Sequence, residues 1–271
     1  MELFDSHSHI DVDAFDADRG DVMVRARAAG VVGQLVPAIA AAGWQHLRDV
    51  CTLFPGELHA AYGMHPMYLD AHRPEHLEQL RERLQSPGCV AVGEIGLDYF
   101  VETLDRERQQ FFFDAQLRLA REFDLPVIVH ARRAVDAVIA SMKKIGGLRG
   151  IVHSFSGSME QAGQLWKMGF LLGIGGPITH ERAQRLRGLV ATMPLEYLVL
   201  ETDSPDQPDA GWRGQRNEPA RLTAILAAVV ELRGESPDVV ATATTANAMR
   251  LLQQHRPAER LSRLSAAADT P

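Results

Sequence analysis

The sequence predicts a TIM (β/α)8 barrel, a closed cylinder of eight parallel strands that are each followed by a helix. Eight short apolar runs alternate with amphipathic stretches along the chain. Several runs are apolar almost throughout, as expected for parallel strands that are buried on both faces. The length of 271 residues is close to that of one such barrel. Eight units in a chain of this length favour a closed barrel over an open doubly wound sheet, which the same alternation also allows.

The apolar runs place the strands and the stretches between them place the helices. In chain order the runs are LFDSH at residue 3, VVGQLV at 31, LHAAYG at 58, VAVGEIG at 90, PVIVHA at 126, GIVHSF at 150, FLLGIG at 170 and YLVLETD at 197. Apolar residues recur at helical spacing at Phe112, Ala115, Leu119 and Phe123. The clearest predicted helices are 75–84, 105–123 and 180–190.

The chain is expected to form one domain. No linker interrupts the alternating pattern, so residues 1–254 are predicted to be a single barrel. The last stretch, 255–271, is polar and rich in alanine, which is typical of a loosely held tail. Since nothing in the sequence indicates a protein partner, we expect a monomer.

Composition excludes several classes of protein. The formal net charge of −7 argues against broad electrostatic binding to DNA or to anionic membranes, although metal ions can still recruit a phosphate substrate. No apolar run approaches the roughly 20 residues of a membrane helix, and MELFDSHSHI lacks the features of a secretory signal. We therefore expect a cytoplasmic protein. The two cysteines, Cys51 and Cys89, fit no CxxC pattern and are interpreted as reduced thiols.

Residues of the types that bind metals follow the apolar part of most predicted strands. From the first strand to the eighth they are His7 and His9, His65, Glu94, His130, His153 and Asp203. In a parallel barrel the C-terminal ends of all strands meet at one mouth, where active sites lie. We therefore expect these side chains to lie close together in space.

The first pair of histidines has the spacing of a shared ligand site. On a strand, residues i and i+2 point to the same face, so His7 and His9 can bind one metal ion. An isolated HxH pair is also compatible with ordinary hydrogen-bonded histidines. Its place at the end of the first strand, beside Asp5 and Asp11, favours the metal interpretation.

Glu94 follows a strand that is predicted to be buried. A carboxylate in such a place is costly unless it is paired with a cation, so either an arginine or a metal ion is expected beside it. The flanking Gly93 and Gly96 indicate a close approach of the backbone at this point. A carboxylate has two oxygens and is therefore able to bridge two metals.

Three further predicted ligands end the later strands. His130 and His153 follow apolar runs on adjacent strands at matching depths, which favours metal binding over two separate core histidines. Asp203 ends the eighth run and is the better candidate for the metal and its water. Glu201, two residues earlier, is expected either to support a ligand or to form an ion pair.

Together these residues predict a site for one or two divalent metal ions. The expected ligands are His7, His9, Glu94, His130, His153 and Asp203. A set of imidazoles and carboxylates without thiolates suits zinc, magnesium, manganese, nickel or iron.

The motifs around these residues resemble those of the TatD family of metal-dependent hydrolases, with a likeness to its YjjV-like branch. The matching segments, over roughly residues 3–252, are DSHSHID, AAYGMHP, VGEIGLDYF, LPVIVHARRA, HSFSGS, GIGGPIT, ETDSP and RGQRNEP. The resemblance implies a barrel of the amidohydrolase type.

The resemblance also implies how the ligands are divided. His7, His9, Glu94 and Asp203 would hold one metal, and Glu94, His130 and His153 would hold the second. The chain departs from the family pattern without losing a ligand. Ser8 and Ser154 replace common cysteines, Ser204 replaces a common alanine, and Asp206 stands where a tyrosine is usual, which puts substrate preference in doubt.

The activity implied by the resemblance is that of a deoxyribonuclease, which removes nucleotides in the 3′ to 5′ direction from single-stranded DNA ends. The hypothesis is hydrolysis by a metal-activated water. Asp203 would orient that water and take its proton, and Glu94 would bridge the metals. Both are therefore predicted to be catalytic.

Residues near the mouth are expected to contact the substrate. His65 is predicted to donate a hydrogen bond to a phosphate or carbonyl oxygen, and Arg132 to bind a phosphate in bidentate fashion. A loop histidine and a solvated arginine are the alternatives. Asn217 and Glu218 are expected either to cap the last helix or to reach the site, and Trp212 either to stack on a base or to pack its loop.

Two other functions fit the same residues. The ligand set does not separate phosphorus from carbon as the centre attacked, so an ester or amide hydrolase, such as a deacylase, or a small-phosphoester hydrolase remains open. The second alternative is a metal-holding barrel that binds a partner without catalysis. Asp203 argues against it, because simple structural binding does not need this additional carboxylate.

Overall fold

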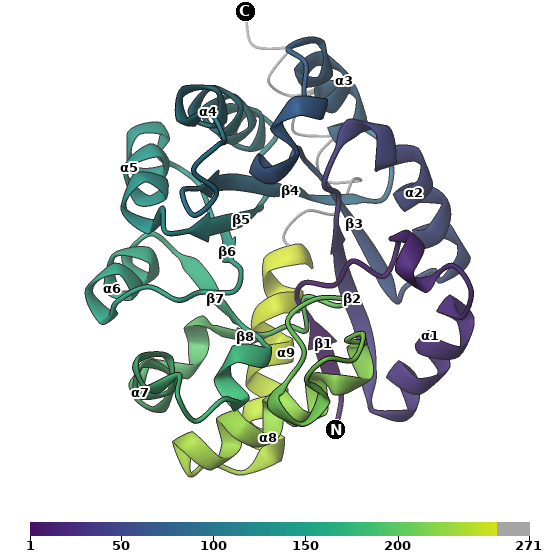
Figure 1. The fold of residues 1–271 in the computed structure, drawn as a ribbon, viewed down its shortest axis with the longest axis vertical. Helices are drawn as coiled ribbons and strands as arrows, with labels where there is room; N and C mark the ends of the chain where they lie inside the picture. The colour runs from purple at the N-terminus through teal and green to yellow at the C-terminus, as the bar shows by residue number, and fades with distance from the viewer. Residues whose placement is uncertain (254–271) are drawn as a thin grey trace, which may run out of the picture.

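The computed structural model describes residues 1–253 and confirms the predicted barrel (Figure 1). Eight parallel strands form one sheet in the order of the sequence. They are β1 Leu3–Asp5, β2 Val31–Pro37, β3 Leu58–Tyr62, β4 Cys89–Asp98, β5 Val127–Arg132, β6 Gly150–Val152, β7 Phe170–Ile174 and β8 Leu198–Leu200. The sheet approaches closure between its first and last strands, where the Ser6 amide donates a hydrogen bond of 2.9 Å to the Leu200 carbonyl.

Helices alternate with these strands and surround them. The α-helices are α1 Arg19–Ala28, α2 Trp44–Leu53, α3 Glu75–Leu84, α4 Arg106–Glu122, α5 Val135–Ile145, α6 Met159–Lys167, α7 Gln184–Thr192, α8 Leu222–Arg233 and α9 Pro237–Gln253. The 3-10 helices are η1 Asp13–Phe15, η2 Ala41–Gly43, η3 Pro66–Ala71, η4 Gly176–Thr179, η5 Leu195–Tyr197, η6 Ala210–Trp212 and η7 Pro219–Arg221. Within residues 1–253, no helix is both long enough and apolar enough to span a bilayer.

The predicted helices agree with the structure except at one start. The helix predicted over 75–84 is α3, and the one predicted over 105–123 is α4, whose N-terminal amides at Glu107 and Arg108 are capped by the Asp105 carboxylate. The helix predicted from residue 180 was placed too early, because the His180 amide closes the preceding 3-10 turn on Pro177. The predicted tail, 255–271, lies outside the described residues, and the monomeric state stays a prediction.

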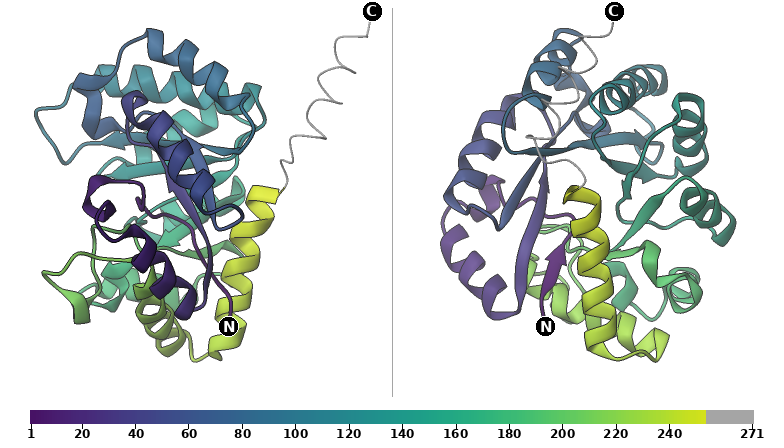
Figure 2. Two further views of the ribbon diagram at one scale, coloured as in Figure 1. Left: turned by 90° about the vertical axis from the view of Figure 1, so that its right-hand side faces the viewer. Right: turned by 180° about the vertical axis from the view of Figure 1, so that it is seen from behind.

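The core consists of two layers, one inside the barrel and one between the barrel and its helices. Each strand contributes one buried apolar side chain to the inner layer, and α9 adds three more. The inner layer is Phe4, Leu35, Ala61, Ala91, Ile128, Ile151, Leu171, Val199, Ala248, Leu251 and Leu252. Figure 2 shows α9 lying across the barrel in the view from behind. This helix therefore closes one end of the barrel and leaves the other end for the site.

The strand period then determines what faces the open end. Side chains two residues apart on a strand share a face, so the residue two positions after each inner apolar residue also points into the barrel. After Ile128 this residue is His130, and after Ile151 it is His153. The barrel is thus apolar at the end closed by α9 and polar at its mouth.

Removing an α9 side chain from the inner layer should destabilise the whole barrel. Leu251 is 7% exposed, and Leu251→Ala is expected to lower the free energy of unfolding by about 2–4 kcal/mol, because it leaves a cavity. Met249 on the same helix is 39% exposed, and Met249→Ala is expected to change it by no more than about 0.5 kcal/mol. Urea denaturation measures both. Equal effects of the two substitutions would contradict this role of α9.

Candidate metal centre

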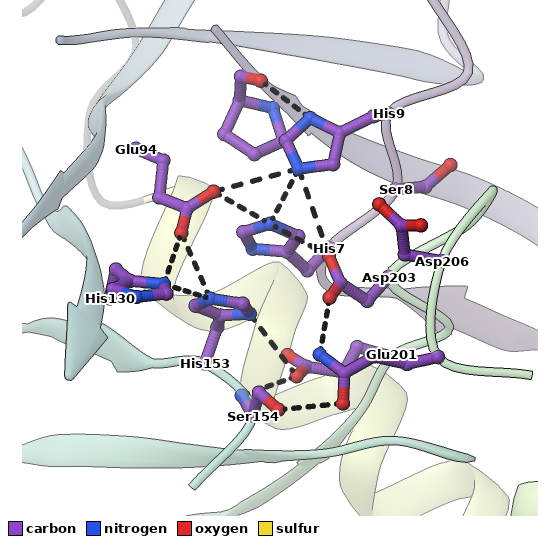
Figure 3. Close-up of polar contacts among 12 residues, drawn as sticks. His7, Ser8, His9, Glu94, His130, His153, Ser154, Glu201, Asp203 and Asp206 are labelled. Atoms are coloured by element: carbon purple, nitrogen blue, oxygen red, sulfur yellow. Dashed lines mark hydrogen bonds and ion pairs between the residues drawn. The ribbon is translucent and has the colours of Figure 1, made fainter. Parts of the chain in front are cut away.

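The structure brings all six predicted ligands together at the mouth of the barrel (Figure 3). The sequence predicts that each ligand follows the end of its strand, and this prediction is wrong for two of them. Glu94 lies inside β4, which continues to Asp98, and His130 lies inside β5, which continues to Arg132. The sheet register shifts between Val92 and Ile95, so the polar end of β4 is longer than its apolar run suggested.

Glu94 lies at the centre of the site and joins two groups of histidines. Its Oε2 is 3.1 Å from His7 Nε2 and 3.5 Å from His9 Nε2. Its Oε1 is 3.1 Å from His130 Nδ1 and 2.9 Å from His153 Nε2. Each carboxylate oxygen therefore faces its own group of predicted ligand imidazoles, and the side chain itself is only 2% exposed.

Asp203 completes the group around Oε2. Its Oδ1 is 3.4 Å from His7 Nε2 and 3.7 Å from His9 Nε2. Its backbone has a φ of 56°, in the left-handed region that is unusual for a residue other than glycine. The Asp203 amide donates to the His7 carbonyl at 2.8 Å, which ties the end of β8 to the end of β1.

Two of the predicted ligand histidines are fixed from behind by hydrogen-bond acceptors. His9 Nδ1 lies 3.1 Å from the carbonyl of Pro37, and His130 Nε2 lies 3.0 Å from Asp98 Oδ2. A carbonyl or carboxylate oxygen only accepts, so these ring nitrogens are the ones that carry the proton. The lone pairs of His9 Nε2 and His130 Nδ1 therefore face the site.

Glu201 lies behind His153, at a distance longer than a hydrogen bond. His153 Nδ1 is 3.6 Å from Glu201 Oε1, which accepts the Ser154 amide at 2.5 Å. Glu201 is completely buried, and a Cβ at Gly173 would lie only 2.0 Å from its carboxylate. Glycine at that position therefore provides the space for Glu201. Of the two roles expected for this residue, the structure places it behind a ligand.

The predicted close approach at the glycines beside Glu94 is also present. Gly96 has a φ of 148°, and a Cβ there would lie 2.0 Å from the His130 carbonyl oxygen. A Cβ at Gly93 would lie 2.6 Å from Ile128. Both glycines allow β4 to pack against β5, and this packing brings Glu94 next to His130.

This arrangement fits a bound cation. Nitrogen lone pairs and carboxylate oxygens converge on the same space, and a group of acceptors is repulsive unless protons or metal ions lie among them. Each of the three overlapping groups of donors has its ligand atoms within 4.8 Å of one another. Histidine ligands that pair their outer nitrogen with a carbonyl or carboxylate are typical of metal sites.

The charges in the site show the same competition between protons and metal ions. Burial alone lowers the pKa of His9, but its hydrogen bond to Glu94 and the charges of Glu94 and Asp203 raise it to about 9. Burial raises the pKa of Asp203 to about 6. A metal ion must displace protons held by these groups, so its affinity decreases as the pH falls.

His65 lies against Glu94, not free in a loop. Its Nε2 is 3.0 Å from Glu94 Oε1, and its Nδ1 accepts the Met67 amide at 3.1 Å. Burial lowers the pKa of His65 to about 4, so it is neutral and donates its Nε2 proton to Glu94. The same residue lines the mouth, and its contact with a substrate stays a prediction.

Arg132 reaches the mouth from the end of β5. Its guanidinium carbon lies 3.7 Å from the centre of the Phe100 ring, and that of Arg133 lies 4.7 Å from the same ring. The exposed guanidinium of Arg132 lines the mouth and is not paired with a carboxylate within the described residues. It is available for an anionic substrate group.

Sequence reasoning missed Gln207 and its contact with Asp203. Gln207 Nε2 donates a short hydrogen bond to Asp203 Oδ2, and the Ser154 hydroxyl donates to Gln207 Oε1 at 3.0 Å. Both Gln207 and Ser154 have a positive φ, of 48° and 45°. In the sequence Ser154 is only a departure from a common cysteine, and no local signal predicts that these two side chains meet.

The remaining candidate residues lie around the loop after β8. The Asn217 amide donates to the carbonyls of Thr202 and Asp206, each at 2.8 Å, and so supports the loop. Glu218 pairs with Arg25, with a shortest distance of 2.7 Å. Trp212 packs the loop, since its Nε1 donates to a carbonyl of that loop at 3.0 Å.

The donors form the floor of a large pocket of about 990 Å³. Asp11, Asp13 and Asp206 lie on its lining, together with Tyr68 and Arg132. The space is larger than one nucleotide or one aminoacyl group requires, so the open end of the barrel can receive a substrate.

The fold and the donors define a class of protein, the metal-dependent hydrolases built on eight-stranded barrels. The family described as TatD related DNase matches residues 4–253. The chain belongs to this TatD family of metal-dependent hydrolases.

Individual relatives agree with this assignment. The chain is 41% identical over 252 residues to the metal-dependent hydrolase YjjV of Escherichia coli K12, covering 92% of this chain and 97% of that protein. It is 34% identical over 260 residues to the 3′-5′ ssDNA/RNA exonuclease TatD of Pantoea vagans, covering 93% and 99%. The crystal structure of Escherichia coli YjjV superposes with a TM-score of 0.88 at 39% identity, covering 93% and 98%.

Asp98 should matter for metal affinity although it touches no metal-facing atom. In Asp98→Asn the Nδ2 group would face His130 Nε2, while Oδ1 would keep the amides of Phe100 and Val101, which it accepts at 2.9 and 3.1 Å. His130 would then turn its proton toward the site. We expect metal affinity to fall about 10- to 100-fold in calorimetric titration, without unfolding.

A suitable control removes the same charge from the same region. Asp105→Asn keeps a good N-cap for α4, so metal affinity should be unchanged. If Asp98→Asn bound metal as tightly as this control, the proposed orientation of His130 would be wrong.

Proposed function

We propose that this hydrolase cleaves phosphodiester bonds at the 3′ ends of single-stranded DNA. The observation that carries the proposal is the division of the donors by Glu94, with one carboxylate oxygen facing each group of histidines. Two adjacent cation sites that share a carboxylate suit the in-line displacement at phosphorus. The name of the Pantoea vagans relative, a 3′-5′ exonuclease, supports degradation of the strand from its 3′ end.

The chain would hold up to two divalent metal ions at this centre. His7, His9, Glu94 and Asp203 are the proposed ligands of one ion, and Glu94, His130 and His153 those of the other. The high share of imidazole favours zinc, nickel or iron over magnesium and manganese. A bound ion supplies a Lewis acid, which lowers the pKa of water and stabilises negative charge on phosphate oxygens.

The remaining steps depend on side chains of the protein. Asp203 is the proposed proton acceptor, because its carboxylate faces His7 and His9 through Oδ1 and is oriented by the Gln207 amide at Oδ2. Asp98 and the Pro37 carbonyl keep His130 and His9 in the tautomers that leave lone pairs toward the metal ions. Arg132 is proposed to bind a phosphate oxygen from the rim of the mouth.

The charges around the mouth favour one path by which a nucleic-acid strand would leave the site. Asp11 and Asp13 follow β1 and Asp206 follows β8, and the ends of β1 and β8 lie next to each other. Arg132 ends β5, on the far side. A polyanion would therefore be repelled by the β1 and β8 loops and leave the mouth past β3 to β5.

The acidic part of the rim also favours a second candidate. Asp11, Asp13 and Asp206 would accept a substrate with little negative charge or with an amino group, so hydrolysis of a small ester or amide fits the same site. An aminoacyl ester is the substrate that separates this candidate from the nuclease. A binding protein without catalysis would turn over neither.

The nuclease proposal is tested with a 5′-labelled single-stranded oligonucleotide and an aminoacyl ester. We expect metal-loaded protein to shorten the oligonucleotide from its 3′ end. Asp203→Asn should lower kcat about 100- to 10,000-fold, because it removes the proton acceptor, while metal content stays largely intact. Asp49→Asn, which removes an exposed charge on α2, is the control and should retain the rate.

Two results would count against the proposal. Release of the amino acid without any nucleotide release would favour the ester hydrolase. Full activity of Asp203→Asn on the oligonucleotide would exclude the role proposed for this carboxylate.

A further inference from the structure

A second pocket lies outside the mouth, on the other side of η3. Its volume is about 540 Å³, and its lining residues are Asp70, Arg73, Pro74, Arg108, Phe111 and Phe112. The mouth and this pocket share η3 as a wall, since Met67 and Tyr68 line the mouth while Asp70 lines the second pocket. The two spaces are therefore neighbours on the surface.

Two guanidinium groups converge in this pocket on a single carbonyl oxygen. Arg73 Nη1 and Arg108 Nη2 each donate to the His72 carbonyl at 2.8 Å. Arg73 Nη1 also donates to the Asp70 carbonyl. These bonds hold both side chains in place, and each guanidinium has five N–H donors, so several donors of each remain for another partner.

Neither of these two arginines is neutralised by an ion pair in the part of the chain that the structure describes. Within residues 1–253, ion pairs to Asp or Glu are made by many arginines, including Arg25, Arg81 and Arg221, but by neither Arg73 nor Arg108. Two like charges fixed at one carbonyl repel each other, and Asp70, the one acidic residue among those lining the pocket, forms an ion pair with neither arginine, so an anionic ligand would be stabilised here. The pKa of His72 is lowered mainly by burial, and the positive charges of these two arginines lower it further.

Exposed aromatic rings accompany the arginines. Phe111 is 52% exposed beside the pocket, and Tyr68 is 46% exposed on the wall between the pocket and the mouth. Nucleic-acid bases stack on exposed aromatic rings of this kind, while arginines bind the backbone phosphates. The pocket also follows β3 and β4, on the side of the mouth away from the acidic loops.

We propose that the pocket between η3, α3 and α4 binds a backbone phosphate of the single strand whose 3′ end lies in the mouth. Arg73 and Arg108 would contact the phosphate, and Phe111 or Tyr68 would stack on a neighbouring base. The inference rests on the proposed nuclease function and extends it, since it predicts that longer strands bind better than dinucleotides.

The test compares cleavage of 5′-labelled (dT)2 and (dT)8 by metal-loaded protein. Arg108→Gln removes the charge, but its amide can still donate to the His72 carbonyl. We expect the KM of this variant for (dT)8 to rise about 10-fold, because one charge-assisted hydrogen bond is lost. Its kcat for (dT)8 and its KM for (dT)2 should stay unchanged. For this variant, the slope of log KM for (dT)8 against the logarithm of the salt concentration should decrease by about 0.7. Arg73→Gln should behave likewise and serves if Arg108→Gln does not fold.

Arg118→Gln is the matched control. Arg118 lies on the same helix, α4, its side chain is 62% exposed and it does not line the pocket, so both KM values should stay at the wild-type level. If Arg73→Gln and Arg108→Gln cleave (dT)8 like this control, the pocket is not a phosphate site although the nuclease stands. If wild-type protein cleaves neither oligonucleotide, the proposed function fails and this inference fails with it.

Discussion

The buried carboxylate of Glu94 is the constraint on which the rest of the site depends. Four imidazole nitrogens lie within 3.1 Å of its two oxygens, from His7, His65, His130 and His153. Burial opposes its ionisation, yet the histidines hold the pKa of Glu94 well below its usual value. An ionised group in this position needs cations around it, and the barrel supplies the geometry in which metal ions can replace protons.

The fold explains why such a costly arrangement is tolerated. The inner layer and α9 provide a large apolar core at one end of the barrel, so the mouth can carry many buried polar groups. Some of their outer atoms are satisfied, by Asp98 behind His130 and by the Pro37 carbonyl behind His9, whereas Nδ1 of His7 and Nδ1 of His153 have no hydrogen-bond partner among the described residues. The strained backbones of Ser154, Asp203 and Gln207 lie in the same region, as is common at functional sites.

The sequence predicted the barrel and brought out the six proposed ligands because both depend on local patterns. Apolar runs predict strands, and strand ends converge in a barrel. The residues that were missed depend on longer-range geometry. Asp98 reaches His130 only because β4 continues past Glu94, and Gln207 reaches Asp203 through a loop in an unusual conformation. Arg73 and Arg108 meet only because η3 packs against α4, which no sequence pattern indicates.

The most direct test of the account is a crystal structure of zinc-loaded protein with anomalous scattering data collected at the zinc edge. We expect two peaks, one on each side of the Glu94 carboxylate, about 3.5–4 Å apart and each about 2.0–2.2 Å from its nearest donors. A single peak away from Glu94, or none among these histidines, would contradict it.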